Sequence, residues 1–275
     1  MRSLRDALDM AGMTDPGRVR GHNEDAVLFD ADLGIVALAD GMGGYNAGEV
    51  ASGLTVDAVN EILRAELAAM SPHLGSGKSL KPQAHDMLML AIERANSVVY
   101  QTACSEPLCA GMGTTLVAAL FYDNRLVVGH VGDSRLYRYR NTDFSRLTRD
   151  HSLLQMQLDA GLITPEEARH ATHKNLVTRA VGIEPEVEPE IQEFLAVPGD
   201  VYLFCSDGLT EMVDDQLIGE MVGQFTDNLP MAAQALVEQA NANGGRDNIS
   251  VALVAVKRDY SAETGWISRL ASRFR

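Results

Sequence analysis

The segment "LGIVALADGMGG" (residues 33–44) joins an apolar run to a glycine-rich end. The apolar run predicts a buried strand, and Asp40 closes that run. Asp-Gly is a common turn signal, so a tight turn that begins at Asp40 is the simplest interpretation. Three of the four residues after Asp40 are glycine, however, and they leave its surroundings free of side chains. The segment thus also allows a ligand to approach this carboxylate. Other parts of the sequence are needed to choose between a simple turn and a ligand site.

The composition limits the classes of function that need to be considered. The 275 residues suit one large domain or two small ones, and a hydrophobic content of 46% is enough for a substantial core. A net charge of −15 argues against nucleic acid as a partner, because proteins hold its phosphates with Lys and Arg. The same charge repels an anionic substrate unless a cation lies in the site. Bound divalent metal ions would supply one.

Cysteine usage and the absence of targeting signals indicate a cytoplasmic protein. Three cysteines are too few for a disulfide framework, and Cys205 in "VYLFCSDG" is expected to pack as a small buried side chain. The N-terminal "MRSLRDALDM" does not resemble a signal peptide. No apolar run approaches the ~20 residues that a membrane-spanning helix needs.

The periodicity of apolar residues predicts strands that alternate with pairs of helices. Asp123-Asn124 is a hairpin connection between two of the strands. Helices in pairs between antiparallel strands indicate a layered α+β domain rather than a βαβ repeat. The predicted strands are 26–30, 33–40, 114–122, 125–131, 134–140, 200–206 and 248–256, and the predicted helix pairs are 47–69 with 83–103 and 214–224 with 229–242.

Two polar stretches raise alternatives. "GSGKS" (75–79) is similar to the end of a phosphate-binding P-loop, but Pro72 stands where that motif needs glycine, so a linker over 71–82 is preferred. The stretch 150–175 is expected to form a flap over the main body. Its histidines lack a clean metal-ligand spacing and are interpreted as solvated surface; they are His151, His170 and His173.

Carboxylates recur at the ends of the predicted strands, beside Gly, Asn or Ser. Turn chemistry explains any one of them, but not why several adjoin the most apolar strands. Like ends of strands meet in a sheet, so these side chains are expected to converge and to need a cation against their mutual repulsion.

A set of ligands that consists only of oxygen atoms favours Mg²⁺, Mn²⁺ or Ca²⁺. Two such ions about 3.5–4 Å apart would activate a bridging water for attack on phosphorus. Arg20 is near enough in sequence to clamp the phosphate. The carboxylates are Asp25, Asp40, Asp133, Asp207 and Asp247.

Seven short blocks are similar to the motifs of a known family. They are "RGHNED" (20–25), "DGMGG" (40–44), "GMGTT" (111–115), "GDSRLY" (132–137), "LVTRAVG" (176–182), "SDGL" (206–209) and "GGRDNIS" (244–250). In this order they resemble the metal-dependent type-2C (PPM) Ser/Thr protein phosphatases, bacterial branch, over about residues 10–257. The resemblance implies a four-layer αββα sandwich, with two stacked antiparallel sheets flanked by pairs of helices. It implies a single domain over 1–257 with its flap at about 150–175, followed by a C-terminal tail over 258–275.

The resemblance also implies roles for individual residues. Asp40 corresponds to the carboxylate that bridges two Mn²⁺ or Mg²⁺ ions, and the carbonyl of Gly41 to a ligand of the second ion. Asp207 and Asp247 correspond to the other direct ligands of the first ion. The remaining correspondences are Glu24 and Asp25 with metal-bound waters, Asp133 with a third and weaker metal site of bacterial members, and Arg20 with the phosphate.

The family activity implied is hydrolysis of phosphoserine and phosphothreonine through a metal-bridging water or hydroxide. The implied partners are phosphorylated proteins, targets of a Ser/Thr kinase, and a monomer is expected. Two positions depart from relatives that carry histidine there, Met42 and Tyr45. Because the pKa of tyrosine is about 10, we expect Tyr45 to contribute substrate contacts rather than a proton. For the tail 265–275, a helix that caps its own domain or a frayed end is preferred over a membrane-docking helix.

Overall fold

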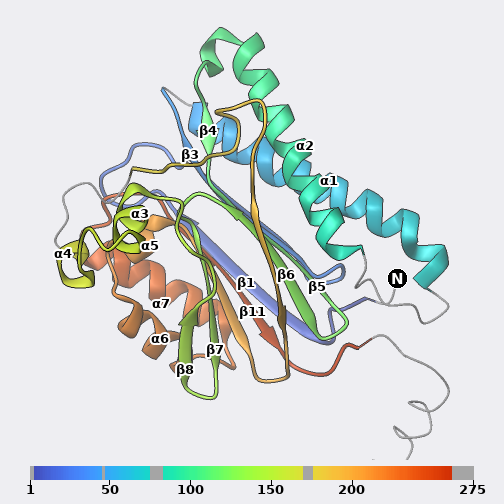
Figure 1. The fold of residues 1–275 in the computed structure, drawn as a ribbon. Coiled ribbons are helices and arrows are strands. Elements are labelled where there is room, and N and C mark those ends of the chain that lie inside the picture. The colour runs from blue at the N-terminus through green and yellow to red at the C-terminus, as the bar shows by residue number, and fades with distance from the viewer. Residues whose placement is uncertain (1–2, 45–46, 75–82, 170–175, 262–275) are drawn as a thin grey trace, which may run out of the picture.

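Two antiparallel β-sheets form the centre of the molecule in the computed structural model, which describes residues 3–44, 47–74, 83–169 and 176–261 (Figure 1). The first sheet has the order β1 (Leu8–Asp15), β11 (Ile249–Val256), β10 (Val201–Cys205), β7 (Arg135–Arg140) and β8 (Asp143–Arg146). The second has the order β2 (Asp25–Asp30), β3 (Ile35–Met42), β5 (Leu116–Tyr122), β6 (Arg125–Val131) and β9 (Glu190–Leu195). The short strand β4 (Gly113–Thr114) pairs with the end of β3.

Long helices cover the outer face of each sheet, as Figure 1 shows. Helices α1 (Ala47–Leu74) and α2 (Ala84–Ser105) pack on the second sheet, and α6 (Asp215–Gln224) and α7 (Leu229–Ala242) pack on the first. The predicted αββα sandwich is therefore confirmed. The shorter helical segments are η1 (Pro107–Cys109), α3 (Leu153–Asp159), α4 (Pro165–Arg169) and α5 (Asp207–Thr210).

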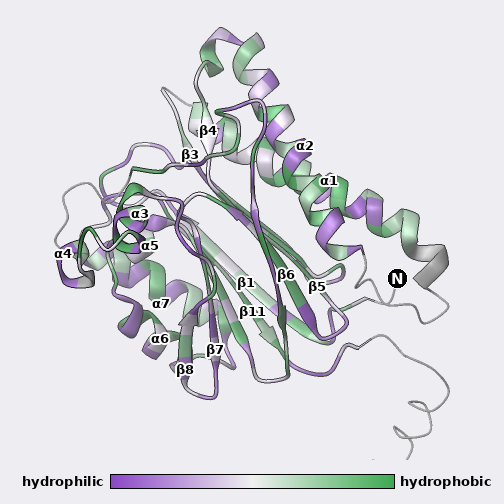
Figure 2. Cartoon of the chain, viewed as in Figure 1, coloured by the Kyte–Doolittle hydropathy of each residue, from purple (hydrophilic) through white to green (hydrophobic). Residues whose placement is uncertain are grey.

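Apolar side chains fill all three interfaces between the four layers. Between the sheets, Phe121 and Tyr202 meet edge to face with their ring centroids 5.5 Å apart. In Figure 2 the central strands carry many hydrophobic residues, whereas hydrophobic and hydrophilic residues alternate along the helices. Cys205 is fully buried, as predicted. This packing makes a rigid support for whatever lies at the strand ends.

The central strands and the long helices agree with the sequence predictions within a few residues. The hairpin at Asp123-Asn124 is confirmed, because both residues adopt the left-handed conformation (φ 45° and 56°) that a two-residue turn between twisted strands requires. Helix α1 extends to Leu74, into the predicted linker, and the "GSGKS" segment lies outside the described residues. In the described part of the chain, no helix is both long and apolar enough to cross a membrane.

The predicted turn at Asp40 is wrong. Strand β3 continues through Asp40 and Gly41 to Met42, because β4 pairs with its end in the register Gly41 with Thr114 and Met42 with Gly113. The glycines therefore do not reverse the chain at Asp40. Gly41 lies within the strand, and Gly43 and Gly44 follow it on the way to helix α1.

Candidate active site

Asp25 and Asp40 lie opposite each other on neighbouring strands, paired in the register of β2 and β3. The backbone of Asp40 is fixed on both sides by hydrogen bonds. Its N–H donates to the Thr115 hydroxyl (3.1 Å), and its carbonyl accepts from Thr115 N–H (2.9 Å) and from the Thr114 hydroxyl (2.8 Å). Asp40 is thus a carboxylate on a rigid backbone.

The remaining acids come from the ends of other strands. Asp133 lies two residues after β6, Asp207 begins α5 two residues after β10, and Asp247 lies two residues before β11. The structure brings these acids to the end of the sandwich where Asp25 and Asp40 lie, so that their charges act on one another. Burial raises the pKa of Asp40 well above its usual value, and the neighbouring negative charges raise it further; they belong to Asp25, Asp207, Asp133 and Asp247.

The same environment shifts the other carboxylates. Burial raises the pKa of Asp25 to about 6, although hydrogen bonds from Ser250 and Ser206 oppose the shift. Burial and the charge of Asp150 raise the pKa of Asp133 to about 6. The pKa of Asp207 is also raised well above normal, by burial first and then by its acidic neighbours. Burial and mutual repulsion therefore disfavour the ionised forms of these carboxylates, and a bound cation would stabilise those forms.

The donor set of this site fits hard divalent cations. Every candidate ligand is an oxygen, which selects Mg²⁺ or Mn²⁺ over softer metals. One carboxylate oxygen, Oδ1 of Asp25, is buried without a hydrogen-bond partner in the described part of the chain. An unpaired buried oxygen is costly for the protein alone, and a bound ion or its water would satisfy it.

Arg20 and Glu24 lie on the loop between β1 and β2, beside these acids. Arg20 donates a hydrogen bond of 2.7 Å to Oδ2 of Asp247, and this bond raises the pKa of the guanidinium. The carboxylate of Glu24 accepts from the N–H of Gly48 at the start of α1, while burial raises its pKa. The predicted phosphate clamp is thus in contact with a predicted metal ligand.

Gly41 has no room for a side chain. A Cβ at this position would lie 2.1 Å from the carbonyl oxygen of Gly48 and 2.5 Å from that of Glu24. Glycine therefore lets the start of α1 and the Glu24 backbone approach β3 closely. It is the close approach, and not a turn, that requires glycine beside Asp40.

Two predictions for the flap and the glycine-rich end have mixed outcomes. Tyr45, His170 and His173 lie outside the described residues. The interpretation of His151 as solvated surface is wrong, since only 8% of this residue is exposed. Its backbone N–H donates to the carbonyl of Gly132 (2.9 Å), and this bond holds His151 beside the end of β6.

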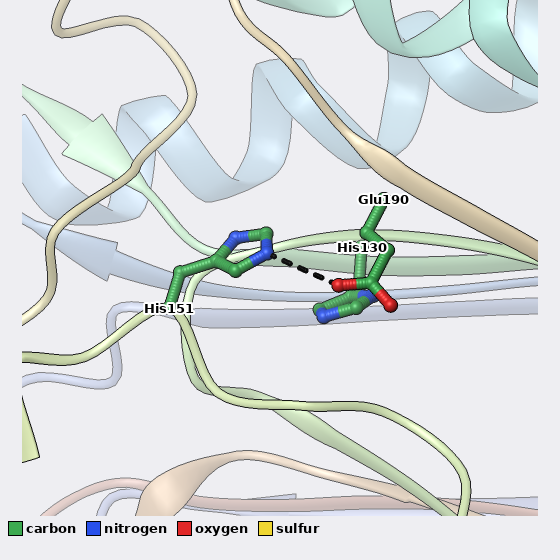
Figure 3. Close-up of side chains that lie close together, drawn as sticks. All are labelled: His130, His151 and Glu190. Carbon is green, nitrogen blue, oxygen red and sulfur yellow. Dashed lines mark ion pairs between the residues drawn. The ribbon is translucent and has the colours of Figure 1, made fainter. Parts of the chain in front are cut away.

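His151 belongs to a second polar cluster, with His130 and Glu190 (Figure 3). One potential ligand atom of each residue lies within 4.8 Å of the others. The hydrogen bonds nevertheless argue against a metal here. Nδ1 of His151 accepts from Gly132 N–H (3.2 Å), so its proton is on Nε2, which faces Glu190 at 3.8 Å and has no free lone pair for an ion.

The sequence predictions missed the residues that position the ligands. Ser206 donates to Oδ2 of Asp25 (2.9 Å), and Asn248 accepts from Glu24 N–H (2.7 Å) through its Oδ1. Each of them directly adjoins a predicted ligand in the sequence, in "SDG" and "RDN". That adjacency was the available signal, but it does not show which distant residue each one contacts.

A comparison with known proteins identifies the class of protein that combines this fold with this site. The protein phosphatase 2C family matches residues 18–243, and the chain belongs to that family. The serine/threonine protein phosphatase PstP of Mycobacterium tuberculosis (strain ATCC 25618 / H37Rv) is 40% identical over 256 residues, 92% of this chain and 46% of PstP. The chain therefore spans about half the length of that relative. The serine/threonine phosphatase stp of Listeria innocua is 37% identical over 244 residues, 88% of this chain and 93% of stp.

Solved structures of relatives share the fold. The crystal structure of the M. tuberculosis phosphatase PstP has a TM-score of 0.81 and 38% identity, and covers 92% of this chain and 100% of that one. A structure of the PstP catalytic domain in complex with two manganese ions has a TM-score of 0.78 and 37% identity. The match covers 91% of this chain and 99% of that one.

Proposed function

We propose that this chain is a metal-dependent protein phosphatase that hydrolyses phosphoserine and phosphothreonine in proteins. The observation that carries the proposal is the convergence of the strand-end carboxylates beside Arg20. Their raised pKa values indicate a site built for cations, and a guanidinium is suited to bidentate recognition of phosphate. The family membership and the named activities of the relatives agree with this reading.

We assign the metal ligands from the site together with the family resemblance. Asp40 and the carbonyl of Gly41 would help to hold two Mn²⁺ or Mg²⁺ ions. Such ions supply charge neutralisation and activation of water at neutral pH. The other assignments are Asp207 and Asp247 as direct ligands of the first ion, Glu24 and Asp25 as partners of its waters, and Asp133 with Asp207 at a third and weaker site.

The protein's own groups account for binding and orientation of the substrate. Arg20 is half-exposed and supplies positive charge on an otherwise acidic protein, so it would draw the phosphate to the carboxylate cluster. The hydrogen bonds at Thr114 and Thr115 hold Asp40 in place without reorganisation. Met42 offers no titratable group, and we infer that no side chain at this position acts as the general acid.

We infer further features of the biological setting from the same family likeness. The substrates would be targets of a Ser/Thr kinase, and the protein would act as a monomer. Its three free cysteines suit the reducing cytoplasm. The phosphatase domain would span 1–257 with the flap at about 150–175. Residues beyond that boundary also contact the domain, since Tyr260 donates from its hydroxyl to the carbonyl of Arg125 (3.0 Å).

The test is hydrolysis of p-nitrophenyl phosphate and of a phosphothreonine peptide, with and without Mn²⁺. We expect activity with Mn²⁺, its loss in EDTA, and its loss in Asp207→Asn even at high Mn²⁺. Asp57→Asn is the matched control, because Asp57 is an exposed acid on α1 and its variant should keep full activity. Activity that survives chelation would contradict the metal-dependent mechanism. Tight phosphopeptide binding without turnover would instead indicate a binding module.

A further inference from the structure

The loop that carries Arg20 has few contacts of its own. Residues 18–22 are all exposed, and the position of a Cβ on Gly21 has no neighbour within 4 Å. A loop of this kind samples many conformations unless its ends are fixed. Recognition of phosphate requires the guanidinium in one place, so some other part of the molecule has to hold the loop.

One buried side chain, that of Asn248, bonds to both ends of this loop. Its Nδ2 donates to the carbonyl of Pro16 (3.0 Å), before the exposed residues, and to the carbonyl of His22 (2.8 Å) at their end. Its Oδ1 accepts from the N–H of Glu24 (2.7 Å). Asn248 is only 5% exposed, and the two carbonyls and one N–H around it define which atom of the amide is nitrogen.

The backbone of the same residue connects the loop to the metal site. The N–H of Asn248 donates to Oδ1 of Asp247 (2.9 Å), whose Oδ2 accepts from Arg20. The dipeptide Asp247-Asn248 thus binds both the guanidinium and the backbone of the loop that carries it. Two adjacent residues therefore hold the side chain of Arg20 and the main chain on either side of it.

We propose that Asn248 is a positioning residue for phosphate recognition: it closes the loop 16–22 and so places Arg20 at the carboxylate cluster. The inference rests on the proposed phosphatase function. Without the two donated bonds, the loop remains attached on its N-terminal side, where Arg18 N–H donates to the carbonyl of Gly245 (2.7 Å). The fold is therefore retained, while the Arg20 side of the loop gains freedom that substrate binding has to remove.

The chain offers a closely matched control in Asn96. This asparagine is 1% exposed, and its Nδ2 donates to the carbonyls of Glu184 (3.0 Å) and Pro185 (3.2 Å). Its Oδ1 accepts from Gly182 N–H (2.7 Å). Asn96 thus makes the same three kinds of bond at a loop that does not carry Arg20. If Asn248→Ala and Asn96→Ala destabilise the protein alike, a difference between them in phosphate binding cannot be due to the loss of stability.

The experiment compares Asn248→Ala, Asn248→Asp and Asn96→Ala with the wild type. At saturating Mn²⁺ we expect both Asn248 variants to raise KM for p-nitrophenyl phosphate and the inhibition constant of inorganic phosphate by about tenfold, which corresponds to ~1.4 kcal/mol of binding. The value of kcat should change much less. Asn96→Ala should lower the thermal unfolding midpoint and leave KM unchanged. In Asn248→Ala, amide hydrogen exchange at Glu24 should become faster.

A double-mutant cycle decides whether the effect acts through Arg20. If it does, Asn248→Ala adds nothing to KM in an Arg20→Ala background. Additive effects, or an unchanged KM in both Asn248 variants, would overturn the proposal and leave the phosphatase function standing. A wild-type protein that hydrolyses nothing with Mn²⁺ would instead overturn the function, and the positioning role with it.

Discussion

The Ser206 hydroxyl donates a hydrogen bond of 2.9 Å to Oδ2 of Asp25 and so connects the two sheets at the carboxylate cluster. Ser206 follows β10 in the first sheet, and Asp25 begins β2 in the second. The same hydroxyl oxygen accepts from the N–H of Ser250 (3.0 Å). One buried side chain therefore supports a strand of each sheet at the place where the negative charges meet.

Ser206→Ala should destabilise the protein in EDTA by about 1.5–3 kcal/mol, the range for a hydrogen bond to a charged group. The loss arises because Asp25 and the Ser250 N–H are both left without this partner. Urea unfolding would measure it. Ser145→Ala is the control, since the Ser145 hydroxyl is buried and has no hydrogen-bond partner in the described residues. Equal stability of the Ser206 variant and the wild type would contradict the role given to this bond.

Asp40→Asn should separate stability from activity. Burial and the acidic neighbours raise the pKa of Asp40, which means that its ionised carboxylate destabilises the metal-free folded protein. The neutral and isosteric amide removes a charge from the cluster. We expect the thermal unfolding midpoint in EDTA to rise by several degrees, while Mn²⁺-dependent hydrolysis is lost.

Calorimetry with and without Mn²⁺ provides the check for Asp40→Asn. The wild type should gain more stability from Mn²⁺ than the variant, because ligand binding stabilises only a site that can hold the ion. A variant that is less stable than the wild type in EDTA would refute the electrostatic argument. Asp57→Asn, on the exposed face of α1, should behave as the wild type in both measurements.

The sequence predicted the interior of this fold better than its margins. Strands β5, β6, β10 and β11 lie inside the sheets and are almost wholly buried, so their apolar runs are unambiguous. Among the described residues, β4 was merged with β5, and three further strands were missed entirely. Each of these three lies at the edge of a sheet, where pairing on one side tolerates polar residues. They are β1 ("LDMAGMTD"), β8 ("DFSR") and β9 ("EIQEFL").

The candidate site shows the same division. Asp40 and its acidic partners were predictable because each adjoins a strong strand signal. The burial of His151 was not, because it depends on hydrogen bonds to Gly132, which lies 19 positions earlier in the chain. Asn248 and Ser206 likewise act on residues more than 180 positions away, at separations of 224 and 181. Local patterns show that such residues are polar, and only the fold shows what they hold.

Gly41→Ala should be among the most damaging small substitutions in the chain. The added Cβ would overlap the carbonyl of Gly48, and backbone atoms on both sides cannot move without displacing α1 from β3. Overpacking of this kind costs about 1–3 kcal/mol or more. Gly53→Ala is the control. Gly53 lies in helix α1, and a Cβ at this position would have no neighbour within 4 Å. It should stabilise the protein by about 0.5–1 kcal/mol. Destabilisation of similar size in both variants would contradict the steric argument.

The pH dependence of stability should carry a contribution from His151. Burial lowers the pKa of this histidine to about 4, and the charges of His130 and Arg179 lower it further, while Glu190 opposes the shift. In the unfolded chain its pKa returns to about 6.5. Between these two values the unfolded state binds the additional proton, so the free energy of unfolding falls as the pH is lowered through this window. Above about 6.5 the contribution is complete.

His151→Gln isolates this contribution from the carboxylates, which titrate in both proteins. The variant loses the bond from Gly132 to the ring at every pH, so it should be less stable than the wild type at pH 7.5. The difference in the free energy of unfolding between the two proteins should shrink as the pH falls toward 4.5. The reason is that only the wild type has a buried imidazole that remains neutral while the unfolded chain binds a proton. Urea unfolding at a series of pH values in EDTA measures this difference. A difference that stays constant over the series would mean that His151 titrates normally and is not buried as the structure shows.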